Sequence, residues 1–522
     1  MAHVIGKTLE RAAPPKDLEI RPKQVKAWIE SLPLQQGAEA TRQLGARLVA
    51  LNRVRLDPET RIQILDICRP VAAALLEDLD AVYGKAALPM GARARETLAL
   101  ARGLAGEMAI GYRIAIAEKS GKLFGARKQL PLLALRVIEH LALSLRASYR
   151  AYTPAPPGTW AQLHEVYLHA EREGVAGEPA DPESRASVLD AYVEVLLLSL
   201  TDPYRLPQGE PDRILALLGG FRGLAVLAQS RPATPTGGHF LVPCDLDKPP
   251  KPSLSANDDN GGPNWRLLDA NALVEKLRAR RSALEAGTVS AAMSKAMGPE
   301  GAALLARLIT LWGDPPKRTA RRDPTEATVA ICAGLKAVSQ FVSLEPKIDL
   351  ATEDEMLRRG ITMPLFALPM DDASQPIPVY EWDVLNKSEG GLKVRRMGPT
   401  QQPIAVGELL GIKSTGKAHW AIGTVRWITL FEEGGMEFGL QFLAPMARTV
   451  WVQPTITSSP QAKGGLLLGD GSAADDTLVT PPNTFSELRE FEIDEDGAIC
   501  RVRARSLLEK TARFELFHIV PS

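Results

Sequence analysis

Apolar side chains recur at helical spacing over most of the first 230 residues. Positions i, i+4 and i+7 lie on one side of a helix, so this period predicts helices with one apolar face. It is found at Leu44, Leu48 and Leu51, and the equivalent helical spacing i, i+3, i+7 and i+11 is found at Ile64, Ile67, Val71 and Leu75. Proline interrupts the pattern at Pro70, Pro89, Pro131 and in the run 154–157. After a flexible N-terminus over residues 1–19, residues 20–230 are therefore predicted to form an all-helical domain of hairpins or a solenoid-like array.

One segment of this region has the spacing of a known helical repeat. Trp160, Leu163, Tyr167 and Ala170, followed by Gly174, match much of the first helix of a tetratricopeptide repeat. One clear copy is visible, whereas an array needs several repeats to bury a continuous core. A repeat-like scaffold and an irregular bundle both stay open. Either would present an interaction surface to a protein partner.

The helical pattern stops at about residue 230. Residues 231–263 are rich in Pro, Gly, Asp and Asn, apart from a short apolar piece at 239–246, and this composition disfavours regular structure. We predict a linker there. Helical spacing returns from Trp265 to Gly287 and from Val289 to Trp312, which predicts a helical connector over residues 264–312.

From Glu326 onward the apolar period changes to two, which is typical of strands with one buried face. Alternating positions occur at Val329, Ile331 and Ala333, at Trp420, Ile422, Thr424, Arg426 and Ile428, and at Phe438, Leu440 and Phe442. Short strands joined by glycine-bearing turns favour a barrel or sandwich over residues 313–450. A further alternation, in which Cys500, Val502 and Ala504 are interleaved with arginines, predicts a small C-terminal β unit over residues 455–522. The fold class is thus multidomain α+β, an N-terminal all-α array followed by antiparallel β structure.

Charge and cysteine content narrow the classes of partner. The 62 basic and 62 acidic residues cancel, so the whole chain has no general attraction to DNA, RNA or an anionic membrane. No apolar run approaches the length needed to span a bilayer, which predicts a cytoplasmic protein without membrane insertion. The four cysteines are far apart without a CxxC pair, so we expect reduced, mostly buried thiols.

Two polar patterns in the β region carry candidate chemistry. An RxxxR pattern precedes the first predicted strand and includes Arg318, Arg321 and Arg322. An NxSxxG pattern precedes the strand at 392–394 and includes Asn386, Ser388 and Gly391. The guanidinium fork of arginine pairs bidentately with phosphate or with guanine O6 and N7. Short polar side chains and glycine at a turn allow close approach to a ligand. Taken singly, the first pattern could be a solvated charge run and the second an ordinary hairpin turn.

The order RxxxR, strand, NxSxxG and two closing strands resembles the PilZ family over about residues 317–445. The closing strands are represented by Gly423–Trp427 and Phe438–Phe442. The resemblance implies a β-barrel that binds cyclic di-GMP as its ligand, without another cofactor or a metal. It also implies that Arg318, Arg321, Arg322, Asn386, Ser388 and Gly391 contact this ligand.

One departure from the family pattern leaves two functions open. Arg322 and Asn386 are 64 residues apart, because a segment around Ser343–Val379 is expected to be inserted between the first two strands. The insertion either covers the site or belongs to a degenerate barrel that binds no nucleotide. The first reading predicts a cyclic di-GMP signalling effector whose helical region engages a protein partner. The alternative is a helical scaffold or adaptor with a ligand-blind barrel.

An enzymatic function is not predicted. The sequence contains no GxxxxGK[ST] phosphate loop, no GxSxG elbow and no HExxH motif. The nearest metal-like pattern, His164-Glu165 with His169, places its two histidines about 140° apart around a helix of 3.6 residues per turn. We therefore assign no catalytic and no metal-binding residue.

Overall fold

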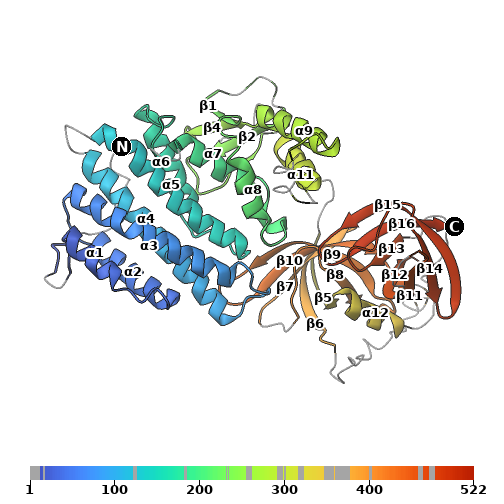
Figure 1. Ribbon diagram of the computed structural model, residues 1–522. Helices are drawn as coiled ribbons and strands as arrows, with labels where there is room; N and C mark the ends of the chain where they lie inside the picture. The colour runs from blue at the N-terminus through green and yellow to red at the C-terminus, as the bar shows by residue number, and fades with distance from the viewer. Residues whose placement is uncertain are drawn as a thin grey trace. The chain divides into compact units, whose positions relative to one another are not determined.

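The structure is a computed structural model, shown in Figure 1. It describes residues 12–15, 18–120, 126–181, 185–230, 232, 234, 236–253, 262–290, 298, 301–315, 323–345, 355, 358, 377–398, 402–456, 462–469 and 477–522. The chain divides into two compact units, the first comprising residues 1–86 and 90–318 and the second comprising 87–89 and 319–522. Within the described residues, no helix is both long and apolar enough to span a membrane.

The first unit is built on a bundle of helices. Its elements up to residue 218 are α1 (Pro22–Glu30), α2 (Gly37–Asn52), α3 (Pro58–Tyr83), α4 (Ala92–Ser120), α5 (Ala126–Arg150), α6 (Thr159–Arg172), α7 (Val188–Ser199), the 3-10 helix η1 (Pro203–Arg205) and α8 (Glu210–Leu218). Helix α4 contacts α2, α3 and α5 at once. Contacts between helices one and two positions apart in the chain occur in stacked helical hairpins as well as in an irregular bundle, so both arrangements fit this packing.

The helical periods of the sequence are confirmed, but two of the predicted interruptions are wrong. Pro70 lies inside α3 and Pro131 lies inside α5. Each proline removes one backbone hydrogen bond, and burial of the surrounding apolar face outweighs that loss. Helix α3 is also fixed at its start by Asp57, whose carboxylate accepts hydrogen bonds from the amides of Glu59 and Thr60.

The repeat-like segment forms a single buried helix face. Trp160, Leu163, Tyr167 and Ala170 are all buried on α6, which packs against α5 and α7. Helix α7 begins with a reciprocal capping box between Ser187 and Asp190. The tetratricopeptide-like spacing thus reports a packing face within the bundle.

The described part of residues 231–263 is not a linker, contrary to the prediction. It contributes two strands to an antiparallel sheet of order β1-β4-β2-β3, made of β1 (Val226–Ala228), β2 (His239–Pro243), β3 (Lys251–Pro252) and β4 (Trp265–Asp269). Asp247 accepts hydrogen bonds from the amides of Gly158 (2.6 Å) and Ala161 (3.0 Å) at the start of α6. The carbonyl of Lys248 lies 2.9 Å from Nε2 of the buried His164. These contacts attach the segment to the bundle.

The predicted helical connector does contain two helices, but the residues that lead into them form a strand. Residues 265–269, expected to be helical, form β4, after which α9 (Asn271–Glu285) and α11 (Gly301–Gly313) follow. A short apolar run has no period that separates a buried strand from a helix. Trp312 is fully buried on α11 and donates from Nε1 to the carbonyl of Leu197 at 3.0 Å.

The bundle buries one histidine without polar partners. His140 on α5 is stacked on Tyr112 of α4, with ring centroids 5.9 Å apart. Neither of its ring nitrogens has a hydrogen-bond partner in the described part of the chain. Burial, and after it the nearby cations Arg136 and Arg69, lowers the pKa of His140 from 6.5 to about 3. The imidazole is therefore neutral at pH 7.

This depressed pKa predicts acid sensitivity of the first unit. Below pH 6.5 the unfolded chain binds a proton at His140 and the folded chain does not, so stability falls as pH falls towards about 3. We expect His140 to lower the free energy of unfolding by up to about 1.4 kcal/mol per pH unit in this range. Urea unfolding at pH 6.5 and 5.0 measures the slope. The variant His140→Phe should have a shallower slope, and an unchanged slope would contradict the prediction.

The second unit contains two closed six-stranded barrels. The first barrel consists of β5 (Asp323–Ala333), β6 (Tyr380–Ser388), β7 (Gly391–Arg396), β8 (Leu409–Ser414), β9 (Ala421–Leu430) and β10 (Met436–Ala444). All of its neighbouring strands are antiparallel. Its interior is filled by side chains that include Trp382 and Phe438, whose rings meet edge to face at 4.7 Å. The predicted PilZ-like antiparallel barrel is confirmed.

The predicted small C-terminal β unit is a complete second barrel. It consists of β11 (Ala447–Pro454), β12 (Lys463–Leu468), β13 (Thr477–Thr480), β14 (Glu490–Glu495), β15 (Ala498–Lys510) and β16 (Glu515–Pro521). In both barrels the strands, counted from the first of each, close in the order first, second, third, sixth, fifth, fourth. All pairs are antiparallel here too. The second unit therefore repeats one topology.

Helix α12 (Leu335–Ser343) joins the two barrels. Its buried side chains Val338 and Phe341 share one apolar cluster with Trp420 of the first barrel and with Leu466 and Phe514 of the second. On the outside, Arg426 of β9 binds Glu509 of β15 through two hydrogen bonds of 2.6 and 2.8 Å. The two barrels thus have a common core.

Strands β9 and β15 and the cysteines can be compared with the sequence-based predictions residue by residue. Arg426 was expected to share a face with Ile428, but a bulge in the pairing with β10 turns Arg426 outward while Ile428 is fully buried. The predicted alternation of β15 is confirmed at Val502 and Ala504, which are buried, but it is wrong at Cys500, which is exposed. The expectation for the thiols also holds, because Cys68, Cys244 and Cys332 are buried and Cys500 is exposed.

Candidate ligand-binding face of the first barrel

The NxSxxG pattern forms the hairpin between β6 and β7. Ser388 pairs with Gly391, which leaves Glu389 and Gly390 as the two-residue tip. The hydroxyl of Ser388 donates to the carbonyl of Gly391 at 3.2 Å. The tip residues are exposed. The pattern is therefore a tight hairpin turn in the outer wall of the barrel.

Asn386 lies on the outside of this hairpin. A bulge at Leu385 places Asn386 opposite the outward-facing Lys393 of β7, one position along from the fully buried Val394. In the described part of the chain its carboxamide makes no hydrogen bond with protein. A half-buried amide without a protein partner is available to a ligand at the barrel surface.

Gly391 has a structural reason to be glycine. A Cβ atom at this position would lie 2.1 Å from the carbonyl oxygen of Leu440 on β10. The neighbouring Gly390 accepts a hydrogen bond from the amide of Phe442 at 3.0 Å. The sequence suggested that this glycine lets the backbone approach a ligand. In the structure the close approach is to the next strand of the barrel.

The RxxxR residues Arg318, Arg321 and Arg322 lie outside the described residues. The first described residue after them is Asp323, which is joined directly to Arg322 and pairs with Lys387 on β6. Pro324 likewise pairs with Asn386. The chain therefore enters the barrel alongside the NxSxxG hairpin, although 64 residues separate the two patterns in sequence.

Strand pairing extends the hairpin into a row of residues that sequence reasoning missed. Lys393 pairs with Gly439 on β10, and Gly439 pairs with Trp427 on β9. A Cβ atom on Gly439 would lie 2.0 Å from Nε1 of Trp427, so the indole lies flat over this glycine. The ammonium of Lys393 is 5.8 Å from the centre of the same ring. The outer face thus combines an amide, a cation and an aromatic plane.

An acidic residue neutralises part of the positive charge on this outer face. Glu437 on β10 forms ion pairs with Lys393 and, at 2.8 Å, with Arg395. By contrast, the exposed Lys387 forms no ion pair within the described residues. The phosphates of a dinucleotide would therefore need further cations, which the adjoining RxxxR segment carries in sequence.

The second barrel does not repeat these patterns. Residues 442–446 before β11 contain no arginine, and the segment equivalent to the hairpin reads Gly469-Asp470-Gly471-Ser472-Ala473-Ala474-Asp475. It keeps an acidic residue and a serine at the NxSxxG spacing but has aspartate where the glycine would be. Of two barrels with one topology, only the first carries both patterns.

Two segments of the chain match models of known protein families. Residues 239–356 and 367–449 match the family model described as the middle PilZ domain of the cyclic-di-GMP receptor FimW. The first barrel therefore lies within a segment that matches a PilZ domain. Residues 23–233 match the model of the FimW N-terminal domain, so the PilZ domain and the helical region before it both have counterparts in that receptor.

The similarity extends over nearly the whole chain. The cyclic-di-GMP receptor FimW of Pseudomonas aeruginosa is 25% identical over 549 aligned residues, which cover 95% of this chain and 90% of that receptor. No solved structure matches the chain. The PilZ-domain match also spans most of the segment expected to be an insertion, Ser343–Val379, and omits only residues 357–366. Most of that segment is thus a feature shared with the FimW family and no departure from it.

Proposed function

We propose that the first barrel binds cyclic di-GMP on its outer face and that the chain is a signalling effector, not an enzyme. The observation that carries this proposal is the pairing of Asp323 and Pro324 with Lys387 and Asn386. It brings the chain that follows the RxxxR pattern to the NxSxxG hairpin. Arg318, Arg321 and Arg322 then bind phosphate or guanine edges, while Asn386 and Ser388 contact the ligand from the turn. Gly391 acts by keeping the hairpin close to β10.

The row from Lys393 to Trp427 supplies a platform for a base in this proposal. Planar bases stack on aromatic side chains with little dependence on sequence. The half-buried indole of Trp427 is held flat by Gly439 beneath it, so its outer face is preorganised for stacking. Lys393 at its edge adds positive charge beside the ring.

Loss of this platform should weaken binding. We expect Trp427→Ala to reduce the affinity for cyclic di-GMP by about 1–3 kcal/mol, and Trp427→Phe to retain most of the affinity. Isothermal titration of the full chain measures both. The matched control is Trp451→Ala, which removes an outward-facing tryptophan from the second barrel, 60% exposed. Equal affinities of the alanine variant at 427 and the control would refute the stacking role.

In the proposed effector the helical region engages a protein partner in the cytoplasm. The support is architectural, because a helical bundle with its own core precedes the barrels here, and this region matches the N-terminal domain that accompanies the middle PilZ domain in the FimW models. By linkage, a partner whose affinity depends on the nucleotide must change the nucleotide affinity by the same factor. The competing function, a scaffold with a ligand-blind barrel, needs only the structural roles of Ser388 and Gly391, whereas the unpartnered carboxamide of Asn386 favours a ligand.

A further inference from the structure

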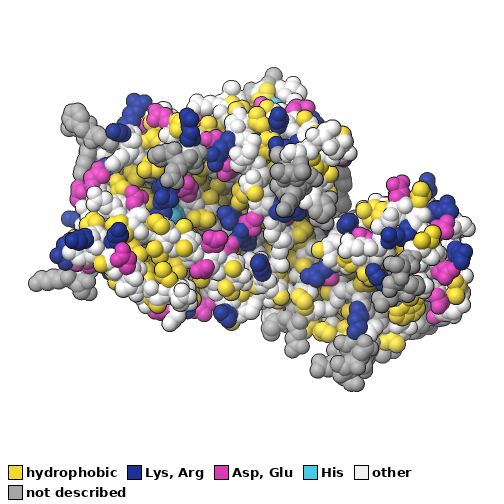
Figure 2. Space-filling model, in the orientation of Figure 1, with side chains coloured by type: hydrophobic (Ala, Val, Ile, Leu, Met, Phe, Trp, Pro, Cys, Tyr) yellow, Lys and Arg dark blue, Asp and Glu magenta, His cyan; other side chains and the backbone are white. Residues whose placement is uncertain are grey.

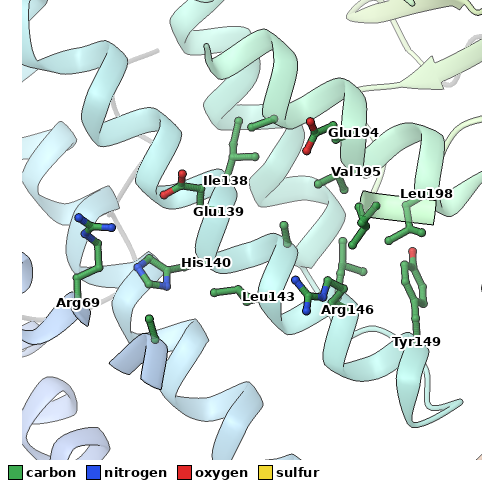
Figure 3. Close-up of a pocket in the computed structure, with 15 residues that line it drawn as sticks. Arg69, Ile138, Glu139, His140, Leu143, Arg146, Tyr149, Glu194, Val195 and Leu198 are labelled. Atoms are coloured by element: carbon green, nitrogen blue, oxygen red, sulfur yellow. The ribbon is translucent and has the colours of Figure 1, made fainter. Parts of the chain in front are cut away.

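A groove crosses the surface of the helical bundle between α3, α5, α7 and α8 (Figure 3). Its volume is about 380 Å³ and most of its lining is apolar. Along α5 it extends from Ile138 to Tyr149, a distance of about 16 Å at 1.5 Å per residue. Val195 and Leu198 of α7 form part of the opposite wall. The groove is thus long and mostly apolar, and it lies in the first unit, which contains neither barrel.

The buried His140 lines this groove. Its side chain is 3% exposed, and both ring nitrogens lack a hydrogen-bond partner in the described structure. Nearly all buried polar side chains in proteins have such a partner. A neutral imidazole has one hydrogen-bond donor and one acceptor. A ligand group that enters between the helices would provide the hydrogen-bond partner that the ring lacks.

A cation without a counter-ion lies near this histidine. Within the described residues the guanidinium of Arg69 on α3 forms no ion pair, and its Nε atom is buried without a hydrogen bond. Figure 3 places Arg69 and His140 at the same end of the groove. The other charged side chains of the lining have partners: Glu139 with Arg136 (2.8 Å), Glu194 with Arg222 (3.4 Å) and Arg146 with Asp212 (3.5 Å). The groove therefore carries one uncompensated positive charge.

We infer that this groove binds an elongated apolar monocarboxylate, with its carboxylate at Arg69 and His140 and its alkyl chain along α5. Arginine pairs with carboxylate through parallel hydrogen bonds. Each methylene buried between α5 and α7 adds favourable transfer free energy. A ligand of this shape matches a pocket with apolar walls and few polar groups.

The same observations disfavour larger or more highly charged occupants. A nucleotide brings several negative charges, whereas the groove has a single unpaired cation and apolar walls. A helix of a partner protein would lie across the opening and leave the 3% exposed imidazole uncontacted. A single carboxylate matches the one unpaired cation at this end of the groove, and its small size lets it enter beside the imidazole.

Titration of the full chain with dodecanoate below its micellar concentration tests the inference. We expect saturable binding with one site per chain, together with a change in the ¹⁵N resonances of the His140 ring. Arg69→Gln should weaken binding at least about tenfold, the effect of losing a charge-assisted hydrogen bond. Dodecanol, which lacks the carboxylate, should bind the unmodified chain more weakly than dodecanoate by a similar factor. Arg93→Gln, an exposed arginine of α4 outside the groove, is the matched control and should bind as the unmodified chain does.

A second variant tests the place of the alkyl chain. Ala191→Trp on α7 should fill the groove and abolish binding while leaving the cyclic di-GMP affinity of the PilZ domain unchanged. The inference is overturned by an absence of saturable binding, by equal affinity of dodecanoate for the Arg69→Gln variant, or by binding that leaves the His140 resonances unaltered.

Discussion

Replacing Arg318 or Arg322 by alanine is expected to weaken cyclic di-GMP binding by about 1.5–3 kcal/mol each, the range for charge-assisted hydrogen bonds. The reason is that guanidinium groups pair with phosphate and guanine in a geometry that no other side chain reproduces. The segment precedes β5 in sequence, and the first residue of β5, Asp323, pairs with Lys387 of the hairpin. Isothermal titration of each variant gives the affinity.

The control for these variants is Arg501→Ala, on the outer face of the second barrel. Arg501 is paired with Glu492 at 2.8 Å and is 67% exposed at its side chain. We expect this substitution to leave cyclic di-GMP affinity unchanged, and all three variants to keep the free energy of unfolding within about 0.5 kcal/mol. If a folded double variant at 318 and 322 binds as tightly as the control, these arginines are not part of the site.

The second large effect concerns stability. Gly391→Ala should destabilise the first barrel by about 3 kcal/mol, because the added methyl group meets the Leu440 carbonyl oxygen at 2.1 Å and a backbone atom between paired strands cannot move aside cheaply. The adjacent Gly390 supplies a matched control. A Cβ atom there has no neighbour within 4 Å, so Gly390→Ala should change stability by less than about 1 kcal/mol.

Hydrogen exchange of the β10 amides and chemical denaturation together measure this difference. Gly391→Ala should lose protection along β7 and β10, with loss of cyclic di-GMP binding as a consequence of the altered barrel. Gly390→Ala should keep both. Equal stability of the two variants would mean that the hairpin and β10 are not packed as closely as described.

The sequence predicted well wherever a long period determined an element. The helices of the first unit and the strands of the first barrel follow from periods of 3.6 and 2. It predicted poorly where packing outweighed a local signal. Pro70 and Pro131 continue through helices whose apolar faces are buried, and 239–243 forms a buried strand despite the prolines and glycines around it. Two barrels of one topology were not foreseen, because strand order depends on contacts distant in sequence.

The residues of the candidate site also fall into those that the sequence predicted and those that it did not. The residues of the NxSxxG pattern were found because a tight hairpin needs those residue types close together in sequence. Lys393, Gly439 and Trp427 were missed, since they come together only through the register of three strands. That register includes bulges at Leu385 and Arg426, which reverse the face that simple alternation assigns.

Isothermal titration of the full unmodified chain with cyclic di-GMP is the most direct test of the proposed function. Binding at the outer face of the first barrel predicts saturable heat release, with an affinity that falls as salt rises because the contacts are charged. The second barrel lacks both patterns, so Ser472→Ala should leave the titration unchanged while Ser388→Ala weakens it. A correctly folded chain that gives no saturable signal would contradict ligand binding and favour the ligand-blind scaffold.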